Sequence, residues 1–179
     1  EDMLPMVYSP RCGELLWYSM IDPSKVTTIC NIISMCSPIY SFLIPYIVLP
    51  NEHKEGIALL HRIVDELHTH HHSTFSNFTV DLSTYLSKGR LDAEDDLIDL
   101  YAKLSQFPKL TYFEICSGPY DILRGLVPRM GLSQLAYVET CVLKTPLNVE
   151  NQGALLTLVH GMESLDTLRL EIYGLFEPI

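Results

Sequence analysis

A short apolar pattern occurs four times along the chain. Residues 75–82, 110–116, 135–142 and 165–172 each carry apolar or near-apolar side chains at their first, fourth and sixth positions. These side chains are Phe75, Phe78 and Val80; Leu110, Phe113 and Ile115; Leu135, Val138 and Thr140; and Leu165, Leu168 and Leu170. The alternation within each segment predicts a strand with one buried face. The regular return of the segment predicts a stacked repeat architecture.

Stretches with a helical spacing of apolar residues separate these strands. They cover residues 54–68, 92–106, 119–130 and 151–162. The first places Ile57, Leu60 and Val64 on one face. The second opens with acids, which the helix dipole favours at an N-terminus. Strand and helix therefore alternate from about residue 46 onward, which predicts parallel strands joined by right-handed helical crossovers.

One segment challenges a soluble assignment, because 26 uncharged residues separate Lys25 from Glu52. That length could span a bilayer. Pro38 and Pro45 interrupt the segment, and a proline breaks the backbone hydrogen bonding that lipid cannot replace. The segment therefore predicts short helices with breaks at the two prolines.

Composition narrows the class of protein further. The 179 residues are 47% hydrophobic and 19% charged, which is typical of a folded domain. A net charge of −10 argues against nucleic-acid and anionic membrane partners, and it leaves room for a basic protein partner. Five cysteines without a CxxC pair predict a reducing compartment, cytoplasmic or nuclear.

The repeated segment, L-x-x-L-x-L, resembles that of leucine-rich repeats over residues 75–179, with an incomplete first unit at 45–50, "PYIVLP". The resemblance implies an α/β fold, a right-handed β/α solenoid whose strand leucines fill a shared core. Other residues stand where the family has Asn or Cys, which predicts an irregular member; they are Ser83, Gly118, Leu143 and Tyr173. A solenoid needs a polar capping unit, so we expect a chain truncated at its C-terminus, or covered there by another chain.

The first fifty residues do not repeat, and part of them resembles an F-box, the helical module that docks on the Skp adaptor of cullin-RING ubiquitin ligases. The matching segments are Glu14–Leu16 with Met20 and Ile21, Asp22 and Pro23 with Val26 and Ile29, and "CSPIYSFL" at 36–43. The resemblance implies an F-box-like helical module at 1–45 and a repeat domain at 46–179. It also implies an adaptor-binding face of Leu15, Leu16, Ile21, Val26, Ile29, Ile33, Tyr40 and Leu43.

Two functions follow from these resemblances. In the first, the chain is the non-catalytic substrate-recognition subunit of a ubiquitin ligase and binds a Skp-type adaptor and a client protein. In the second, it is a plain leucine-rich-repeat recognition module whose N-terminal helices only cap the solenoid. Exposure of the apolar face of residues 15–43 would favour docking, and burial against the first repeat would favour a cap.

The residues that could carry chemistry are few. A histidine cluster could bind a metal; its members are His61, His68, His70, His71 and His72. No cysteine or carboxylate spacing completes a site, so we expect a histidine-rich helix end and no metal or cofactor. The cysteines lack a neighbouring histidine that would make them nucleophiles, and are expected to be small buried fillers. No catalytic motif is present, which predicts a protein that is not an enzyme.

Strand alternation also predicts the side chains that a client would meet. Positions 3 and 5 of each strand should face outward on the concave sheet; those predicted to bind are Asn77, Tyr112, Glu114, Tyr137, Glu139, Thr167 and Arg169. With strands about 4.8 Å apart, Tyr112 would lie beside Tyr137 and Glu114 beside Glu139. Tyrosines offer rigid contact area and paired carboxylates favour a basic client. Alternatively, these are ordinary sheet-surface residues.

Overall fold

The computed structural model describes residues 6–11, 13–17, 21–44, 53–80, 82–87 and 92–171. These residues form one seven-stranded sheet in which the order of strands in space is their order in the chain. The strands are β1 (Met6–Ser9), β2 (Glu14–Trp17), β3 (Ser41–Ile44), β4 (Asn77–Val80), β5 (Tyr112–Cys116), β6 (Thr140–Lys144) and β7 (Thr167–Glu171). β1 and β2 pair antiparallel, and the other neighbours pair parallel. The predicted α/β class with a mainly parallel sheet is confirmed.

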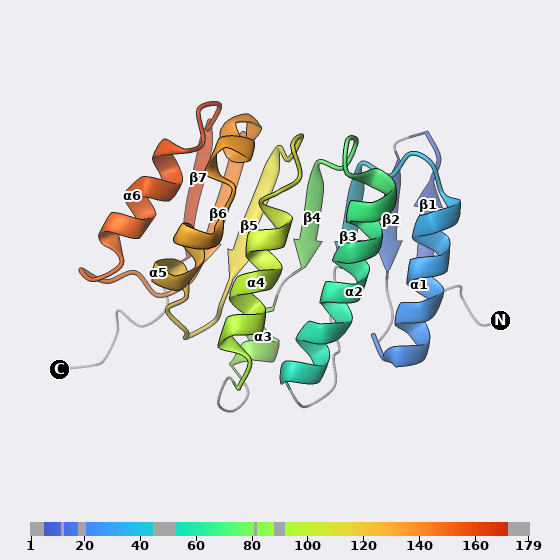
Figure 1. Cartoon of the computed structure of the whole chain (residues 1–179), viewed down its shortest axis with the longest axis horizontal. Coiled ribbons are helices and arrows are strands. Elements are labelled where there is room, and N and C mark those ends of the chain that lie inside the picture. The colour runs from blue at the N-terminus through green and yellow to red at the C-terminus, as the bar shows by residue number, and fades with distance from the viewer. Residues whose placement is uncertain are drawn as a thin grey trace.

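Helices cover one face of this sheet in a single layer (Figure 1). They are α1 (Pro23–Met35), α2 (His53–His71), α3 (Ser83–Leu86), α4 (Glu94–Leu104), α5 (Leu123–Leu126) and α6 (Gln152–His160), with 3-10 turns η1 (Val127–Arg129) and η2 (Leu132–Tyr137). α1 packs on α2, α2 on α4, α4 on α5 and α5 on α6. The opposite face carries no helix of the described residues (Figure 1). We call it the open face.

A repeated hydrogen-bond pattern joins each unit to the preceding one. The carbonyl of the residue directly before a strand accepts two backbone amides from the start of the next unit. For example, the amides of Ser76 and Asn77 donate to the oxygen of Tyr40 at 2.8 and 3.1 Å. The five acceptors are Gly13, Tyr40, Ser76, Thr111 and Glu139. The strands β2 to β6 therefore begin at equivalent positions of successive units.

The buried side chains of the strands follow the predicted spacing, with one error of frame. Buried triplets at positions 1, 4 and 6, none more than 5% exposed, are Ile39, Phe42 and Ile44; Phe75, Phe78 and Val80; Leu110, Phe113 and Ile115; and Val138, Cys141 and Leu143. The predicted strand beginning at Leu135 is wrong. Leu135 is a buried residue of the turn η2. Its spacing to Val138 therefore resembles the strand pattern, although the strand itself begins at Thr140.

The described residues of the N-terminal segment do not form the predicted helical module. They contain β1, β2 and β3 and one helix, α1, and "CSPIYSFL" includes Ile39 and Phe42 of the first buried strand triplet. The sheet has strands on both sides of the predicted boundary between residues 45 and 46. The strand predicted at 45–50 lies outside the described residues. Asp22 caps α1 by accepting the amide of Lys25 at 2.9 Å, and Pro23 stands in the first turn.

The predicted helices 54–68, 92–106 and 151–162 are confirmed as α2, α4 and α6. The predicted helix at 119–130 shortens to α5, because the 3-10 turn η1 with Pro128 follows directly. Leu168 and Leu170 of β7 are 39% and 40% exposed, so the prediction that they fill a shared core is wrong. None of the described helices has the length and apolar character needed to cross a bilayer.

Candidate functional site

Two tyrosines stand out on the surface. Among the described Tyr, Phe and Trp side chains, only Tyr40 and Tyr137 are exposed, at 42% and 64%. Tyr40 directly precedes β3, and Tyr137 ends the turn η2 just before β6. The sequence had assigned them to different sites, Tyr40 to adaptor docking and Tyr137 to client binding.

Both tyrosines line one groove at the edge of the sheet where the parallel strands begin, the upper edge in Figure 1. The groove has a volume of about 810 Å³. Its other walls come from the segments that precede β4 and β5, namely Thr74, Ser76, Pro108, Lys109 and Thr111. The groove therefore crosses the starts of β3, β4, β5 and β6. We call it the strand-start groove.

Internal hydrogen bonds hold the hydroxyl walls of this groove. The hydroxyl of Ser76 donates to the backbone carbonyl of Tyr40 at 3.0 Å. The hydroxyl of Thr74 donates to the backbone carbonyl of His71 at 3.2 Å. Thr111 donates to the carbonyl of Ser76 at 3.5 Å. These hydroxyls have used their single proton, so they can only accept from a ligand.

Gly13 positions the ring of Tyr40. Gly13 has φ +59 and lies so close that an added Cβ would meet Cδ2 of Tyr40 and stand 2.9 Å from the carbonyl oxygen of Pro38. Only a residue without a side chain permits this approach and this backbone conformation without strain. The phenols of Tyr8, Tyr101 and Tyr112 donate to protein acceptors. Those of Tyr40 and Tyr137 make no hydrogen bond to the residues that the structure describes.

A polar network occupies the open face next to this groove. Nζ of Lys144 lies 2.8 Å from Oε1 of Glu114, with the side chains 14% and 4% exposed. The phenol of Tyr112 donates to Oε2 of the same carboxylate at 2.9 Å. Burial, and then the neighbouring Glu114, raise the pKa of Tyr112 above its ordinary value. Both carboxylate oxygens of Glu114 are therefore engaged within the protein.

This network corrects the predicted pairing on the open face. The sheet register places Tyr112 opposite Thr140 and Glu114 opposite Val142. Tyr137 and Glu139 precede β6 and do not stand in it. The predicted stacking of two tyrosines and the predicted pair of glutamates are both wrong, because the frame of this unit was misplaced by three residues.

The remaining predicted client-binding residues stand in strands, with their side chains on the open face. The register aligns Asn77 with Tyr112, Tyr112 with Thr140, and Thr140 with Thr167, so these side chains form one row. Arg169 lies on β7 and pairs with Glu171 at 2.8 Å. Glu114 and Glu171 therefore each have a basic partner within the sheet.

The predicted adaptor-binding residues are divided among three places. Five of them have 0% exposure in the core: Leu15, Ile21, Val26, Ile29 and Ile33. Leu16 and Leu43 are half-buried on the open face of β2 and β3, and Tyr40 lines the groove. The apolar side of α1, which includes Val26, Ile29 and Ile33, is covered because α1 packs against α2. The eight residues therefore do not form one exposed surface.

The histidines of α2 bind neighbouring units to each other. Nε2 of His71 lies 2.8 Å from the carbonyl oxygen of Ile33 at the end of α1, while Nδ1 accepts the amide of Ile39 at 3.4 Å. Nε2 of His61 lies 2.8 Å from the carbonyl oxygen of Asp96 in α4. Within the described part of the chain, no three His, Cys, Asp or Glu side chains stand close enough to hold a metal ion.

Cysteines occupy packing positions in the described regions. Cys30, Cys116 and Cys141 are buried and Cys36 is half-buried; Cys12 lies outside the described residues. Burial raises the pKa of the Cys141 thiol to about 12. A thiol with that pKa supplies almost no thiolate near neutral pH, which agrees with a packing role for Cys141.

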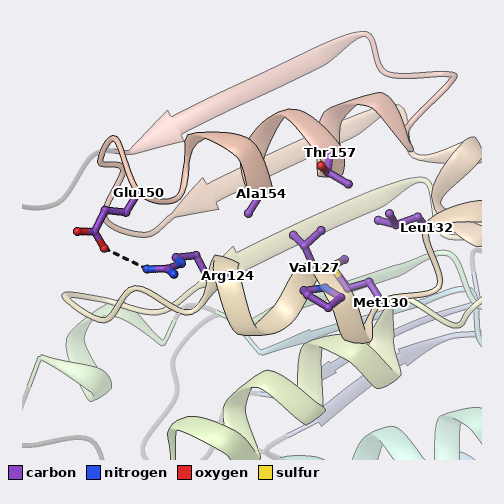
Figure 2. A pocket seen from close by; sticks show the side chains of 8 residues that line it. Arg124, Val127, Met130, Leu132, Glu150, Ala154 and Thr157 are labelled. Carbon is purple, nitrogen blue, oxygen red and sulfur yellow. Dashed lines mark hydrogen bonds and ion pairs between the residues drawn. The ribbon is translucent and has the colours of Figure 1, made fainter.

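A second groove of about 550 Å³ separates α5 and η1 from α6 (Figure 2). At one end, Arg124 and Glu150 form an ion pair at 3.0 Å, with side chains 62% and 76% exposed. Figure 2 shows Val127 and Met130 on one wall and Ala154 on the other. An exposed ion pair contributes little to stability. We interpret this groove as a packing gap between two units, because it has no exposed aromatic side chain.

Sequence reasoning missed two basic residues of these sites, Lys109 and Lys144. A signal for Lys109 was present, since it stands with Pro108 between the buried side chains Phe107 and Leu110. That arrangement is typical of a tight turn whose polar side chain, here that of Lys109, points to solvent. No such signal existed for Lys144, because its partner Glu114 comes from another unit.

No family model matches the sequence, and no curated protein matches it. The resemblances to an F-box and to leucine-rich repeats therefore rest on this chain's own residues alone.

Proposed function

We propose that this chain is a protein-recognition module of the leucine-rich-repeat type, which binds a partner protein at the strand-start groove and the adjoining open face. One observation carries the proposal: the two exposed aromatic side chains of the described residues, Tyr40 and Tyr137, line the same groove. Tyrosines are enriched among the residues that contribute most to protein interfaces. They bring a large contact area at a low cost in conformational entropy.

The arrangement of the units supports the repeat interpretation. Strand order follows chain order, and equivalent carbonyls receive the next unit at each of five steps. Each unit thus contacts its neighbours in the sequence, as in a solenoid. We take the crossovers to be right-handed, since nearly all parallel connections are. In this interpretation the open face is the concave, binding side.

The substrate-receptor function in a ubiquitin ligase stays a prediction with less support. Its docking face requires apolar side chains that a Skp-type adaptor can cover. Five of the eight residues, among them Leu15 and Ile29, have 0% exposure. Such burial favours the alternative, in which the N-terminal segment caps the first repeats.

A test of the proposal selects ligands first and then removes the tyrosines. A displayed library of random peptides is enriched on the wild-type protein, and the affinity of the selected peptides is measured by fluorescence anisotropy. We expect Tyr40→Ala with Tyr137→Ala to weaken binding at least about tenfold, the loss typical of interface hot spots.

The matched control removes exposed apolar side chains elsewhere. Met35 and Leu156 are 81% and 52% exposed and lie on α1 and α6. Met35→Ala with Leu156→Ala should leave the affinity unchanged, and thermal melts should show both double variants folded. If selected peptides bound the tyrosine variant as tightly as the wild type, or if the library yielded no specific binder, the proposal would be rejected.

A further inference from the structure

The strand-start groove has a charge opposite to that of the whole chain. The sequence carries a net charge of −10, yet the groove's lining residues include one charged side chain, Lys109, and no Asp or Glu. We infer that the partner segment held in this groove is an extended acidic peptide with a carboxylate against Lys109. This inference rests on the proposed recognition function of the same groove.

The local fold keeps Lys109 available. Phe107 and Leu110 are buried at 0% and 1% exposure, and the amide of Leu110 donates to the carbonyl of Phe107 at 3.3 Å. The turn is thus anchored on both sides, and Lys109 between them is exposed. Five of the other described basic side chains form ion pairs within the protein, namely Lys103, Arg124, Arg129, Lys144 and Arg169. Lys109 forms none with the described residues.

The hydrogen-bonding groups of the groove also favour an anionic ligand. Its unused donors are the ammonium of Lys109 and the phenols of Tyr40 and Tyr137. The proton of each hydroxyl on the walls is already donated to a backbone carbonyl. A carboxylate accepts several hydrogen bonds, and bonds with a charged partner are stronger than neutral ones. An acidic side chain therefore satisfies the lysine and can accept from a tyrosine as well.

The groove's length suits a short extended segment. Three strand steps of about 4.8 Å separate the starts of β3 and β6, or roughly 14 Å, which four or five extended residues cover. Beyond Tyr137, the row of residues that precede the strands continues with Glu139 and Asp166, both exposed. These acids disfavour a ligand carboxylate at that end. The carboxylate is therefore expected at Lys109, in the segment before β5, and not beyond Tyr137.

The test uses three labelled pools of hexapeptides, which carry Glu, Gln or Lys at the same two positions among varied apolar residues. Anisotropy titrations at low salt should show the Glu pool binding the wild type about tenfold more tightly than the Gln pool, with the difference shrinking as salt screens the pair. Lys109→Ala should abolish this preference. Glu139→Gln should strengthen binding of the Glu pool about twofold. The control Lys54→Ala, an exposed lysine on α2, should change neither affinity.

The outcomes separate the two proposals. Equal binding of the Glu and Gln pools that still depends on Tyr40 and Tyr137 would overturn the acidic ligand and keep protein recognition. A loss for Lys54→Ala as large as for Lys109→Ala would also overturn it, because general attraction would then explain the preference. If no pool bound and the random library yielded no specific binder, both proposals would fall.

Discussion

At the scale of the residue, Glu114 illustrates how neighbours decide the role of a side chain. Its position in the strand alternation predicted an exposed acid. In the structure it is 7% exposed, with Lys144 and Tyr112 on its two carboxylate oxygens. The residue that was expected to attract a basic partner is instead part of a buried network that joins β5 to β6.

We expect this buried pair to be strongly coupled. Lys144→Met should lower the free energy of unfolding by about 3 kcal/mol, because it leaves an uncompensated buried charge. Adding Glu114→Gln to that variant should recover part of the loss, with a coupling energy of at least about 1 kcal/mol in a double-mutant cycle. Urea denaturation of the four proteins measures this quantity. A coupling near zero would mean that the pair does not form in solution.

His68 gives a second prediction at this scale. Its Nε2 is buried without a hydrogen-bond partner among the described residues, and burial, followed by the nearby His72, lowers its pKa. The unfolded chain, with an ordinary histidine pKa of about 6.5, takes up a proton first as the pH falls. Stability contributed by neutral His68 is therefore complete above about pH 6.5 and is lost below it.

His68→Leu should remove this part of the acid sensitivity. The variant should also gain about 1 kcal/mol at neutral pH, because an unpaired polar atom leaves the interior. Thermal melts at pH 7.5 and 5.5 compare the two proteins. If the melting temperature of the variant fell between these pH values by as much as that of the wild type, the burial of Nε2 would be refuted.

At the scale of the element, β6 depends on a frame that its own sequence leaves ambiguous. Leu135 and Val138 fit the start of a strand pattern, and both are buried. Leu135 is a buried residue of η2, and Val138 is the residue that directly follows this turn. The hydrogen bonds from Glu139 and Thr140 to the carbonyl of Thr111 place the start of the strand.

A pair of adjacent substitutions tests this frame. Cys141 is fully buried on the helix-covered side, whereas Thr140 is half-buried on the open face. Cys141→Asp should destabilise the protein by more than about 3 kcal/mol, since an unpaired charge enters the core. Thr140→Asp should stay within about 1 kcal/mol of the wild type. The frame beginning at Leu135 predicts the reverse order in a denaturation experiment.

At the scale of the whole molecule, the sheet continues from β1 to β7 and includes the segment that resembles an F-box. Leu15 on β2 and Ile29 on α1 belong to the same hydrophobic core as the later units. The core side of the N-terminal segment is thus covered by its own helix and strands together with α2. An adaptor that required those side chains would have to open the first units.

We therefore expect Leu15→Asp with Ile29→Asp to unfold the first units, with loss of helical circular dichroism and a lower melting temperature. The control Met35→Asp, at a site 81% exposed on the same helix, should be tolerated. Size exclusion with a Skp-type adaptor should show no complex of the wild-type chain. A wild-type complex, lost in a double variant that stays folded, would restore the ubiquitin-ligase function.

The sequence by itself determined the elements whose burial pattern is local. The stripes of α2 and α4, and the strands that begin after Phe75 and Leu110, were predicted where the structure has them. In these segments the spacing of apolar residues matches one secondary structure over its full length. Such features need only residues within a turn or two.

The tertiary structure alone decided which surfaces are free. Tyr40 and Tyr137 come from different units, and only the stacking of the units between them brings both to one groove. The pairing of Glu114 with Lys144 and the covering of α1 by α2 likewise join residues that are far apart in sequence. A local pattern states which side of an element is apolar, whereas exposure depends on what the neighbouring units place against that side.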